Sequence, residues 1–361
     1  MRILYLTDRL SLRGGAGHHL LDLIRGMADR AQVSVAAGQI QTPLPPGVQG
    51  HRIRGLAAQG AEPSGLSGLG KLMDSADVIH VQNLMNPTAL HATTATGRAV
   101  VTIQDHRLFC PGPGRTLPNG TRCAVQMGDE ACTTCLPDPE YRTRILGLTQ
   151  ARAEALGGAR LVVLSRYMAQ ELAAAGLPGA HIIPPAVEAA PAPSPPGTGF
   201  LLGGRLVQHK GIDQAAEAWA VAGIEAPLKV AGMGPMAHQL PGAELLGWLD
   251  RPALRQALSR ARALIFPSRW QEPFGILGVE ALAMGTPVVA MVRGGMTDWA
   301  DHGTLCVDPG DVSGMAAGIQ ALHADPDKAA VLGREGWASV RERYQEAPLL
   351  ARLWSVYTNA A

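Results

Sequence analysis

Long apolar runs are absent from this sequence. No stretch approaches the ~20 consecutive apolar residues that a membrane-spanning helix needs. The first apolar run, Ile3–Leu6, ends at Thr7 and Asp8, and a run of that length is too short for a secretory signal peptide. We therefore expect a cytoplasmic protein that makes at most peripheral contact with the inner face of a membrane.

A strong net charge is also absent. The chain has 31 Lys and Arg residues against 30 Asp and Glu residues, which gives a formal net charge of +1. No electrostatic field therefore favours nucleic acid as a partner. Only four of the basic residues are lysines, so guanidinium groups must make most of the basic contacts. The 47% of hydrophobic residues is typical of a folded protein rather than a disordered one.

Two cofactor motifs are missing as well. Gly14-Gly15-Ala16-Gly17 follows the first apolar run, but its glycines do not have the spacing of a dinucleotide-binding motif, and no acidic partner follows ~20 residues later. No Asp-x-Asp pair lies in a loop that we expect to line a ligand cleft. The sequence thus disfavours an NAD enzyme and does not indicate a catalytic metal ion.

Short apolar runs alternate with helical patterns, which is typical of doubly wound α/β domains. The length of 361 residues predicts about two such domains. Strands are predicted at Ile3–Leu6, Val33–Ala37, Val78–Val81, Ala99–Ile103, Leu161–Leu164, Phe200–Leu202, Leu228–Ala231, Ala263–Phe266 and Pro287–Val292. Helices are predicted at Asp213–Val221, Pro252–Arg262, Leu277–Met284 and Ala347–Tyr357, with another starting at Asp311 and burying Met315, Ile319 and Leu322.

Proline marks the predicted domain boundary. Residues 189–198 hold several prolines, which exclude a helix or a central strand and predict a stiff linker. Residues 1–188 would then form a first domain and residues 199–345 a second. Residues 346–361 carry the final predicted helix. In sheets of this kind, ligands bind outside the carboxyl ends of the strands.

Two glutamates follow a predicted strand in the second domain. Pro273 keeps a helix from running through Glu272, so Glu272 should lie in the loop at the end of the strand. The next residues, Phe274, Gly275, Ile276 and Leu277, open a helix whose N-terminus attracts phosphate. Glu280 lies about one turn inside that helix. The two carboxylates can therefore accept hydrogen bonds from one hydroxyl-rich ligand, although either glutamate alone would be better explained as a solvated charge.

Two cations lie on another predicted loop of the same domain. Arg205 and Lys210 follow a strand and precede a helix, and their side chains suit a diphosphate. A cation at a helix start otherwise opposes the helix dipole, which favours a ligand there. Gly234 and Trp248 follow further apolar runs, in Gly232-Met233-Gly234 and in Gly247-Trp248-Leu249. Alone, these two short motifs are weak, and Gly234 fits a simple tight turn equally well.

Glu272 and Glu280 together match the E-x7-E signature, and over nearly its whole length the chain resembles the family 4 retaining glycosyltransferases. The supporting motifs are Gly14-Gly15, Asp77-Val78-Ile79-His80-Val81, Val163-Leu164-Ser165, Pro184-Pro185-Ala186-Val187-Glu188, Gly204-Arg205-Leu206, Lys210-Gly211 and Gly294-Gly295. The resemblance implies the GT-B fold, in which two Rossmann-like domains face a central cleft and the last helix crosses back to the first domain.

The resemblance also assigns roles to residues. Arg205 and Lys210 would bind the diphosphate of a UDP- or GDP-sugar without a catalytic metal. Glu280 would bind the ribose and Glu272 the transferred sugar, and a hydroxyl acceptor, saccharide or lipid-linked, would bind the first domain. Donor contacts would also involve Gly15, Gly234, Trp248 and residues 274–277. The products implied are polysaccharides, glycolipids or other glycoconjugates.

The sequence departs from the family pattern at two positions. Gln104 stands where a histidine usually contacts the donor sugar, and it cannot carry a charge. Gln82 replaces a second histidine, and His106 follows too near Gln104 to point the same way. We expect Gln104 to take a catalytic position with an altered rate or sugar choice. Two alternatives therefore stay open, namely a nucleotide-sugar epimerase and a non-catalytic nucleotide-binding protein.

Four of the five cysteines fall within residues 110–137. Cys110, Cys123, Cys132 and Cys135 include one C-x2-C pair, in a segment rich in Gly, Pro and Thr that lacks a core pattern. This spacing favours a structural zinc site, with free thiols, two disulfides or an iron–sulfur cluster as alternatives. The segment resembles a Cys-rich insertion found in some members of the family. We expect Cys306, in an apolar run, to be a core residue.

Overall fold

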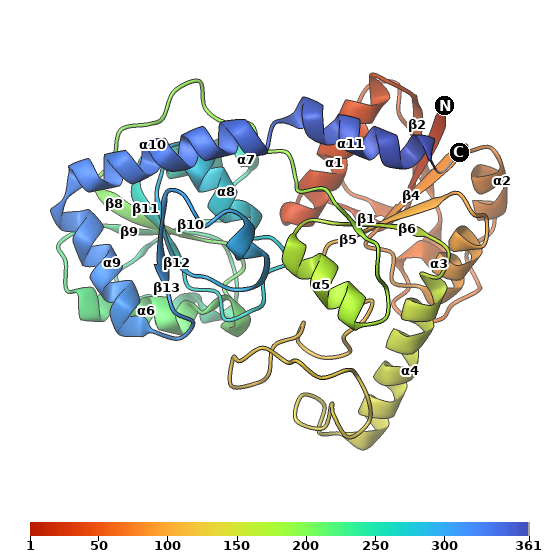
Figure 1. Cartoon of the computed structure of the whole chain (residues 1–361), viewed down its shortest axis with the longest axis horizontal. Coiled ribbons are helices and arrows are strands. Elements are labelled where there is room, and N and C mark those ends of the chain that lie inside the picture. Colours follow the sequence, from red (N-terminus) through yellow and green to blue (C-terminus); the bar gives the residue numbers. More distant parts are fainter. Residues whose placement is uncertain (360–361) are drawn as a thin grey trace. The chain divides into compact units, whose positions relative to one another are not determined.

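The computed structural model describes residues 1–359, which form two compact units (Figure 1). One unit comprises Met1–Ala186 together with the chain from Glu346 onward, and the other comprises Val187–Gln345. Each unit contains one parallel sheet with helices interleaved between its strands. The predicted α/β, doubly wound class is therefore confirmed.

The first unit is built on a seven-stranded sheet in the order β3-β2-β1-β4-β5-β6-β7. Its strands are β1 (Arg2–Leu10), β2 (Gln32–Ile40), β3 (Gln49–Arg52), β4 (Val78–Gln82), β5 (Ala99–Ile103), β6 (Arg160–Val163) and β7 (His181–Ile182). Its helices are α1 (Gly15–Ala28), α2 (Leu69–Asp74), α3 (Pro87–Thr94), α4 (Pro139–Ala155), α5 (Arg166–Ala174) and α11 (Glu346–Thr358), with a short helical turn η1 (Arg54–Ala57).

Both faces of this sheet are buried, as the unbroken apolar runs predict. Along β1, Leu4 and Leu6 belong to one hydrophobic cluster, whereas Ile3 and Tyr5 belong to another on the opposite face. This alternation follows from the two-residue period of a strand. The sheet is thus covered on both sides and presents its strand ends to ligands.

The C-terminal helix α11 is anchored at the centre of the first sheet. The hydroxyl groups of Tyr357 and Tyr5 lie 3.0 Å apart, and Tyr357 also hydrogen-bonds to Nδ1 of His80. The other ring nitrogen of His80 lies 2.7 Å from the hydroxyl of Thr102. Burial lowers the pKa of His80 to about 3, so the ring is neutral and holds α11 in place.

The second unit contains a six-stranded sheet in the order β10-β9-β8-β11-β12-β13. Its strands are β8 (Gly199–Gly203), β9 (Leu228–Ala231), β10 (Glu244–Gly247), β11 (Ala261–Phe266), β12 (Val288–Met291) and β13 (Thr304–Val307). Its helices are α6 (Ile212–Ala222), α7 (Arg251–Ser259), α8 (Ile276–Ala283), α9 (Val312–Ala324) and α10 (Pro326–Arg343), with helical turns η2 (Gln208–Lys210), η3 (Pro235–Gln239) and η4 (Gly294–Asp298).

The proline-rich segment 189–198 lies within the second unit. The backbone N–H of Ala190 donates to the carbonyl of Ala283 at 2.8 Å, and that of Ser194 donates to the carbonyl of Met284 at 2.9 Å. The indole of Trp337 donates to the carbonyl of Ala190 at 2.8 Å. The segment therefore lies against α8 and α10.

Cys306 corrects one expectation from the sequence. The apolar run around it forms β13, but β13 is an edge strand of its sheet and Cys306 is exposed. An apolar run alone does not distinguish an edge strand from a central one.

Within residues 1–359, no helix combines the length and the apolar character needed to cross a bilayer.

Candidate functional site

Three of the predicted site residues, Arg205, Lys210 and Glu272, lie on the two loops at the switch point of the second sheet. Strand β8 has β9 on one side and β11 on the other, so the chain leaves β8 and β11 toward opposite sides of the sheet. The loop after β8 carries Arg205 and Lys210, and the loop after β11 carries Glu272. Ligands of doubly wound folds bind at this place, because the two loops diverge and leave space between them.

Lys210 and Glu272 form a direct ion pair. The ammonium nitrogen of Lys210 lies 2.6 Å from Oε1 of Glu272, and the hydroxyl of Ser268 donates to the same oxygen at 2.7 Å. Glu272 is only 4% exposed, so its carboxylate depends on these partners. Two of the four residues predicted to form the pocket are therefore in contact, although 62 positions separate them in sequence.

A glycine is required to bring the two loops together. Gly211 has a φ of +71°, and a Cβ atom there would lie 1.8 Å from the carbonyl oxygen of Pro267. No side chain could be accommodated at that distance. The Lys210-Gly211 motif thus places the ammonium group of Lys210 against the end of β11.

Two aromatic residues that the sequence analysis missed complete this cluster. Nη2 of Arg205 lies 3.4 Å from Nε2 of His209, and the His209 ring meets the Trp270 ring edge to face with centroids 5.4 Å apart. The Lys210 ammonium lies 5.0 Å from the centroid of the Trp270 ring. The N–H groups of Arg269 and Trp270 both donate to the carbonyl of His209, at 3.1 and 3.0 Å. Contacts therefore join five residues in one cluster, namely Arg205, His209, Lys210, Trp270 and Glu272.

His209 makes the stability of the second unit depend on pH. Burial, followed by the positive charges of Lys210 and Arg205, lowers the pKa of His209 to about 4. Between pH about 6.5 and about 4, an unfolded chain would bind a proton that the folded chain does not bind, so stability falls as the pH falls. We predict that His209→Gln flattens this part of the profile, measured as the free energy of unfolding in urea at several pH values. An unchanged slope, equal to that of the exposed control His238→Gln, would contradict the prediction.

Glu280 lies in a separate contact from Glu272. It belongs to α8 and its Oε1 lies 3.5 Å from Nε of Arg251, the first residue of α7. Trp248 precedes Arg251 in the loop that leaves β10, and its side chain is 41% exposed. The ion pair thus links Glu280 to the start of α7.

The residues that open α8 offer backbone groups to a ligand. Gly275 caps the helix with a φ of +85°, and the first N–H groups of the helix, at Ile276 and Leu277, have no acceptor within the helix. The Phe274 side chain is buried against Tyr344, with ring centroids 5.7 Å apart. The carbonyl of Phe274 accepts from the indole of Trp299 at 2.6 Å, so Phe274 serves the packing of the loop and its ring is not available to a donor molecule.

The Gly232-Met233-Gly234 turn packs on the loop that carries Arg205. A Cβ atom on Gly232 would lie 1.9 Å from the carbonyl oxygen of Gly204, and one on Gly234 would lie 2.3 Å from that of Leu206. The glycines therefore let the β9 loop support the β8 loop directly. The close packing alone is a sufficient reason for glycine at positions 232 and 234.

A polar network lies at the switch point of the first sheet, between β1 and β4. The amide nitrogen of Gln104 donates to Nδ1 of His19, and the amide oxygen of Gln104 accepts from Gln82 at 3.0 Å and from Asn83 at 3.3 Å. Gln82 also donates to the carbonyl of Ala16 at 2.9 Å, in the first turn of α1 that Gly15 begins. Gln82 and Gln104 are thus joined in one cluster.

A histidine that the sequence analysis missed stands beside Gln104. His19 comes from α1, whereas His106 is buried and its Nε2 lies 3.0 Å from the hydroxyl of Tyr167. The imidazole next to Gln104 is therefore that of His19, and His106 is used in packing. No motif in the sequence linked His19 to Gln104, because the two are 85 positions apart.

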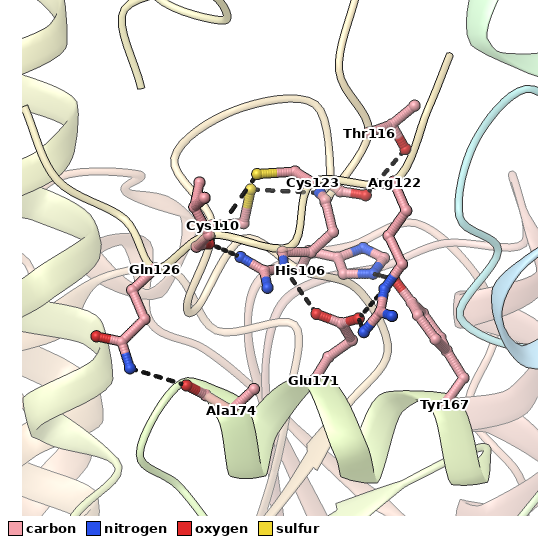
Figure 2. Close-up of polar contacts among 12 residues, drawn as sticks. His106, Cys110, Thr116, Arg122, Cys123, Gln126, Tyr167, Glu171 and Ala174 are labelled. Carbon is pink, nitrogen blue, oxygen red and sulfur yellow. Dashed lines mark hydrogen bonds and ion pairs between the residues drawn. The ribbon is translucent and has the colours of Figure 1, made fainter. Parts of the chain in front are cut away.

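The four clustered cysteines line a single pocket in the segment between β5 and α4. Figure 2 shows the sulfur atoms of Cys110 and Cys123 facing one another above α5. All five cysteines of the chain are free thiols. Within residues 1–359, no group of three or more His, Cys, Asp or Glu side chains is placed, as the side chains stand, so that it could hold a metal ion.

Ion pairs, two of them at a buried carboxylate, attach this segment to the first unit. Glu171 of α5 has no exposed surface, and its carboxylate accepts from Nε of Arg115 at 2.6 Å and from Nε of Arg122 at 2.7 Å (Figure 2). Nε of Arg142 donates to Asp129 at 2.8 Å. Apart from one isolated bridge between Thr116 and Arg122, residues 104–138 contain no helix or strand.

Two family models together match most of the chain. The model "Glycosyltransferase Family 4" matches residues 13–190, and the model "Glycosyl transferases group 1" matches residues 197–337. One match covers the strands of the first sheet, and the other covers those of the second. Two such α/β units are the architecture of the GT-B fold. The chain belongs to the family 4, group 1 glycosyltransferases.

Known proteins support the same assignment. The chain is 38% identical over 89 residues to a glycogen synthase of Mycobacterium tuberculosis, which is 24% of this chain and 21% of the relative. It is 32% identical over 142 residues to a D-inositol 3-phosphate glycosyltransferase of Thermobispora bispora, covering 39% of this chain and 31% of that one. The matches thus span at most about a third of these two relatives.

Solved structures match over nearly the whole chain. A sucrose-phosphate synthase of Thermosynechococcus elongatus matches with a TM-score of 0.69 and 19% identity, over 99% of this chain and 98% of the other. HepE of Anabaena in complex with UDP-glucose matches with a TM-score of 0.69 and 17% identity, over 99% of both chains. At this identity the likeness shows the fold alone.

Proposed function

We propose that this chain is a retaining glycosyltransferase that moves a sugar from a nucleoside diphosphate sugar to a hydroxyl acceptor. The observation that carries the proposal is the cluster of Arg205, His209, Lys210 and Glu272 at the switch point of the second sheet. It combines two cations and a buried carboxylate on loops held together by a glycine. A diphosphate and a sugar need these partners at adjacent positions.

The proposed mechanism assigns charge stabilisation to the cations. Arg205 and Lys210 would neutralise the charge that develops on the departing diphosphate, and the N–H groups at the start of α8 would bind its oxygens. Glu272 would accept hydrogen bonds from the hydroxyls of the transferred sugar. The acceptor hydroxyl would attack from the face that the phosphate leaves and pass its proton to that phosphate, so the anomeric configuration would be retained. These groups supply what a divalent cation supplies elsewhere, so we propose no catalytic metal.

The donor test uses a panel of UDP-, GDP- and ADP-sugars with simple alcohols and saccharides as acceptors. UDP-glucose comes first, because the matching HepE structure was solved in complex with it. Release of nucleoside diphosphate together with a glycosylated acceptor of unchanged anomeric configuration supports the proposal. An altered sugar on the intact nucleotide would instead indicate an epimerase. Binding without any turnover would indicate a nucleotide-binding protein.

Glu280 is predicted to set the affinity for the nucleotide. Glu280→Ala removes the carboxylate that we assign to the ribose hydroxyls, and a charged hydrogen-bond partner of this kind is worth about 2 kcal/mol, or about thirtyfold in Kd. Calorimetric titration with UDP, GDP and ADP measures the loss. The control Glu217→Ala, on the exposed face of α6, should bind as the unmodified protein does. Equal affinities for both variants would refute the assignment.

A further inference from the structure

Beyond the proposed function, the Cys-rich segment presents four thiols to one pocket. Cys110, Cys123, Cys132 and Cys135 all contribute to its wall. The four residues span 26 positions of sequence but line the same pocket.

The local backbone changes direction at two places that carry cysteines. One is the bend at Cys110-Pro111-Gly112, where the N–H of Arg115 donates to the Cys110 sulfur at 3.4 Å. Cys132 and Cys135 form the other, where the N–H of Cys135 donates to the carbonyl of Cys132 at 3.2 Å. Backbone N–H donors to a sulfur atom stabilise its thiolate form and so favour metal ligation.

The two turns meet at a glycine. A Cβ atom on Gly112 would lie 3.2 Å from Cβ of Cys135 and 3.7 Å from its sulfur atom. The turn of Cys110 is therefore directly against the turn of Cys135, and Cys123 faces Cys110 in Figure 2. The four cysteines share the wall of this pocket but do not yet have the geometry of metal ligands, so an ion bound there would have to draw their side chains together.

Between Cys110 and Cys135 the segment buries no hydrophobic side chain. It has no regular secondary structure beyond one bridge, and the side chain of Val125 is 52% exposed. Its ion pairs attach Arg115 and Arg122 to α5, but they leave the C-x2-C turn without a hydrophobic core. Small segments that bury little hydrophobic surface are commonly stabilised by a metal ion or a disulfide.

We propose that Cys110, Cys123, Cys132 and Cys135 bind one structural Zn²⁺ ion through four thiolates. Zinc binding releases the thiol protons and needs no oxidant, whereas two disulfides would need one. Tetrahedral coordination with Zn–S distances of ~2.3 Å would hold the two turns and Cys123 together. The ion would be remote from the donor residues in sequence and would order the segment rather than take part in transfer.

Metal analysis of the full-length protein tests the proposal. After growth with added zinc and purification under reducing conditions, we expect about one zinc ion per chain, and less than about a tenth in Cys132→Ser/Cys135→Ser. Cys306→Ser is the matched control, since Cys306 is the one cysteine outside the segment, and it should retain the zinc of the unmodified protein.

A second measurement needs no variant. Replacing zinc with Co²⁺ in the unmodified protein should give the absorption bands of tetrahedral cobalt with thiolate ligands. Absence of zinc and of these bands would overturn the proposal, as would a non-reduced protein whose mass is lower by four hydrogen atoms, because that mass shows two disulfides. Loss of zinc in Cys306→Ser would also overturn it.

Discussion

Lys210→Ala is expected to lower both sugar transfer and stability. The substitution leaves the Glu272 carboxylate, only 4% exposed, with the Ser268 hydroxyl as the partner at its Oε1 atom. Removing one member of a buried ion pair costs about 3 kcal/mol, because the other charge stays desolvated. The same change removes a cation from the proposed diphosphate site, so kcat/KM should fall by about a hundredfold or more. Urea denaturation and a nucleotide-release assay measure the two effects.

A double variant separates the two effects of Lys210. In Lys210→Met/Glu272→Gln, no charge is left unpaired, so much of the lost stability should return. Transfer should stay as slow as in Lys210→Ala, because both the cation and the carboxylate are gone. If transfer recovered along with stability, the ion pair would be purely structural and the proposed donor site would be wrong.

Arg205→Ala is expected to slow transfer without affecting the fold. Arg205 is exposed, and the contact of its Nη2 atom with His209 at 3.4 Å is a weak one, so the free energy of unfolding should change by less than about 0.5 kcal/mol. If its guanidinium neutralises the leaving diphosphate, its loss should reduce kcat about a hundredfold, which corresponds to about 2.7 kcal/mol.

Two further variants calibrate this result. Arg205→Lys keeps the charge but loses the bidentate geometry, so it should fall between Arg205→Ala and the unmodified protein. Arg334→Ala removes an exposed arginine of α10 and should leave transfer unchanged. Full activity in Arg205→Ala would contradict the role proposed for the guanidinium.

The regular elements were predictable where burial was strong. Ala99–Ile103 and Leu228–Ala231 were predicted with the observed bounds, because both are largely apolar runs that end at a clear break, Gln104 in the first case and Gly232 in the second. The edge strands β3, β7 and β10 were missed, because their side chains are largely exposed and carry no buried pattern. Helix α10 was also missed, although Asp325 caps it and Pro326 begins it.

The site was predictable only in part for a related reason. Lys210 and Glu272 lie on loops whose sequence motifs identify strand ends, so their shared position followed from parallel topology. His209 and His19 have no such motif. Each becomes part of a polar cluster only because the fold brings distant segments together, as with His19 and Gln104. Contacts of this kind depend on loop geometry, which periodicity does not encode.

The carboxylate of Glu171 restricts how this protein could be re-engineered. It is fully enclosed and is neutralised by two arginines from the Cys-rich segment, while α5 itself belongs to the ordinary framework of the sheet. A chimera that exchanged the segment for a short loop would strand that negative charge inside the molecule. Grafting the segment into or out of a relative therefore demands a matching substitution on the helix, so the two must be transplanted together.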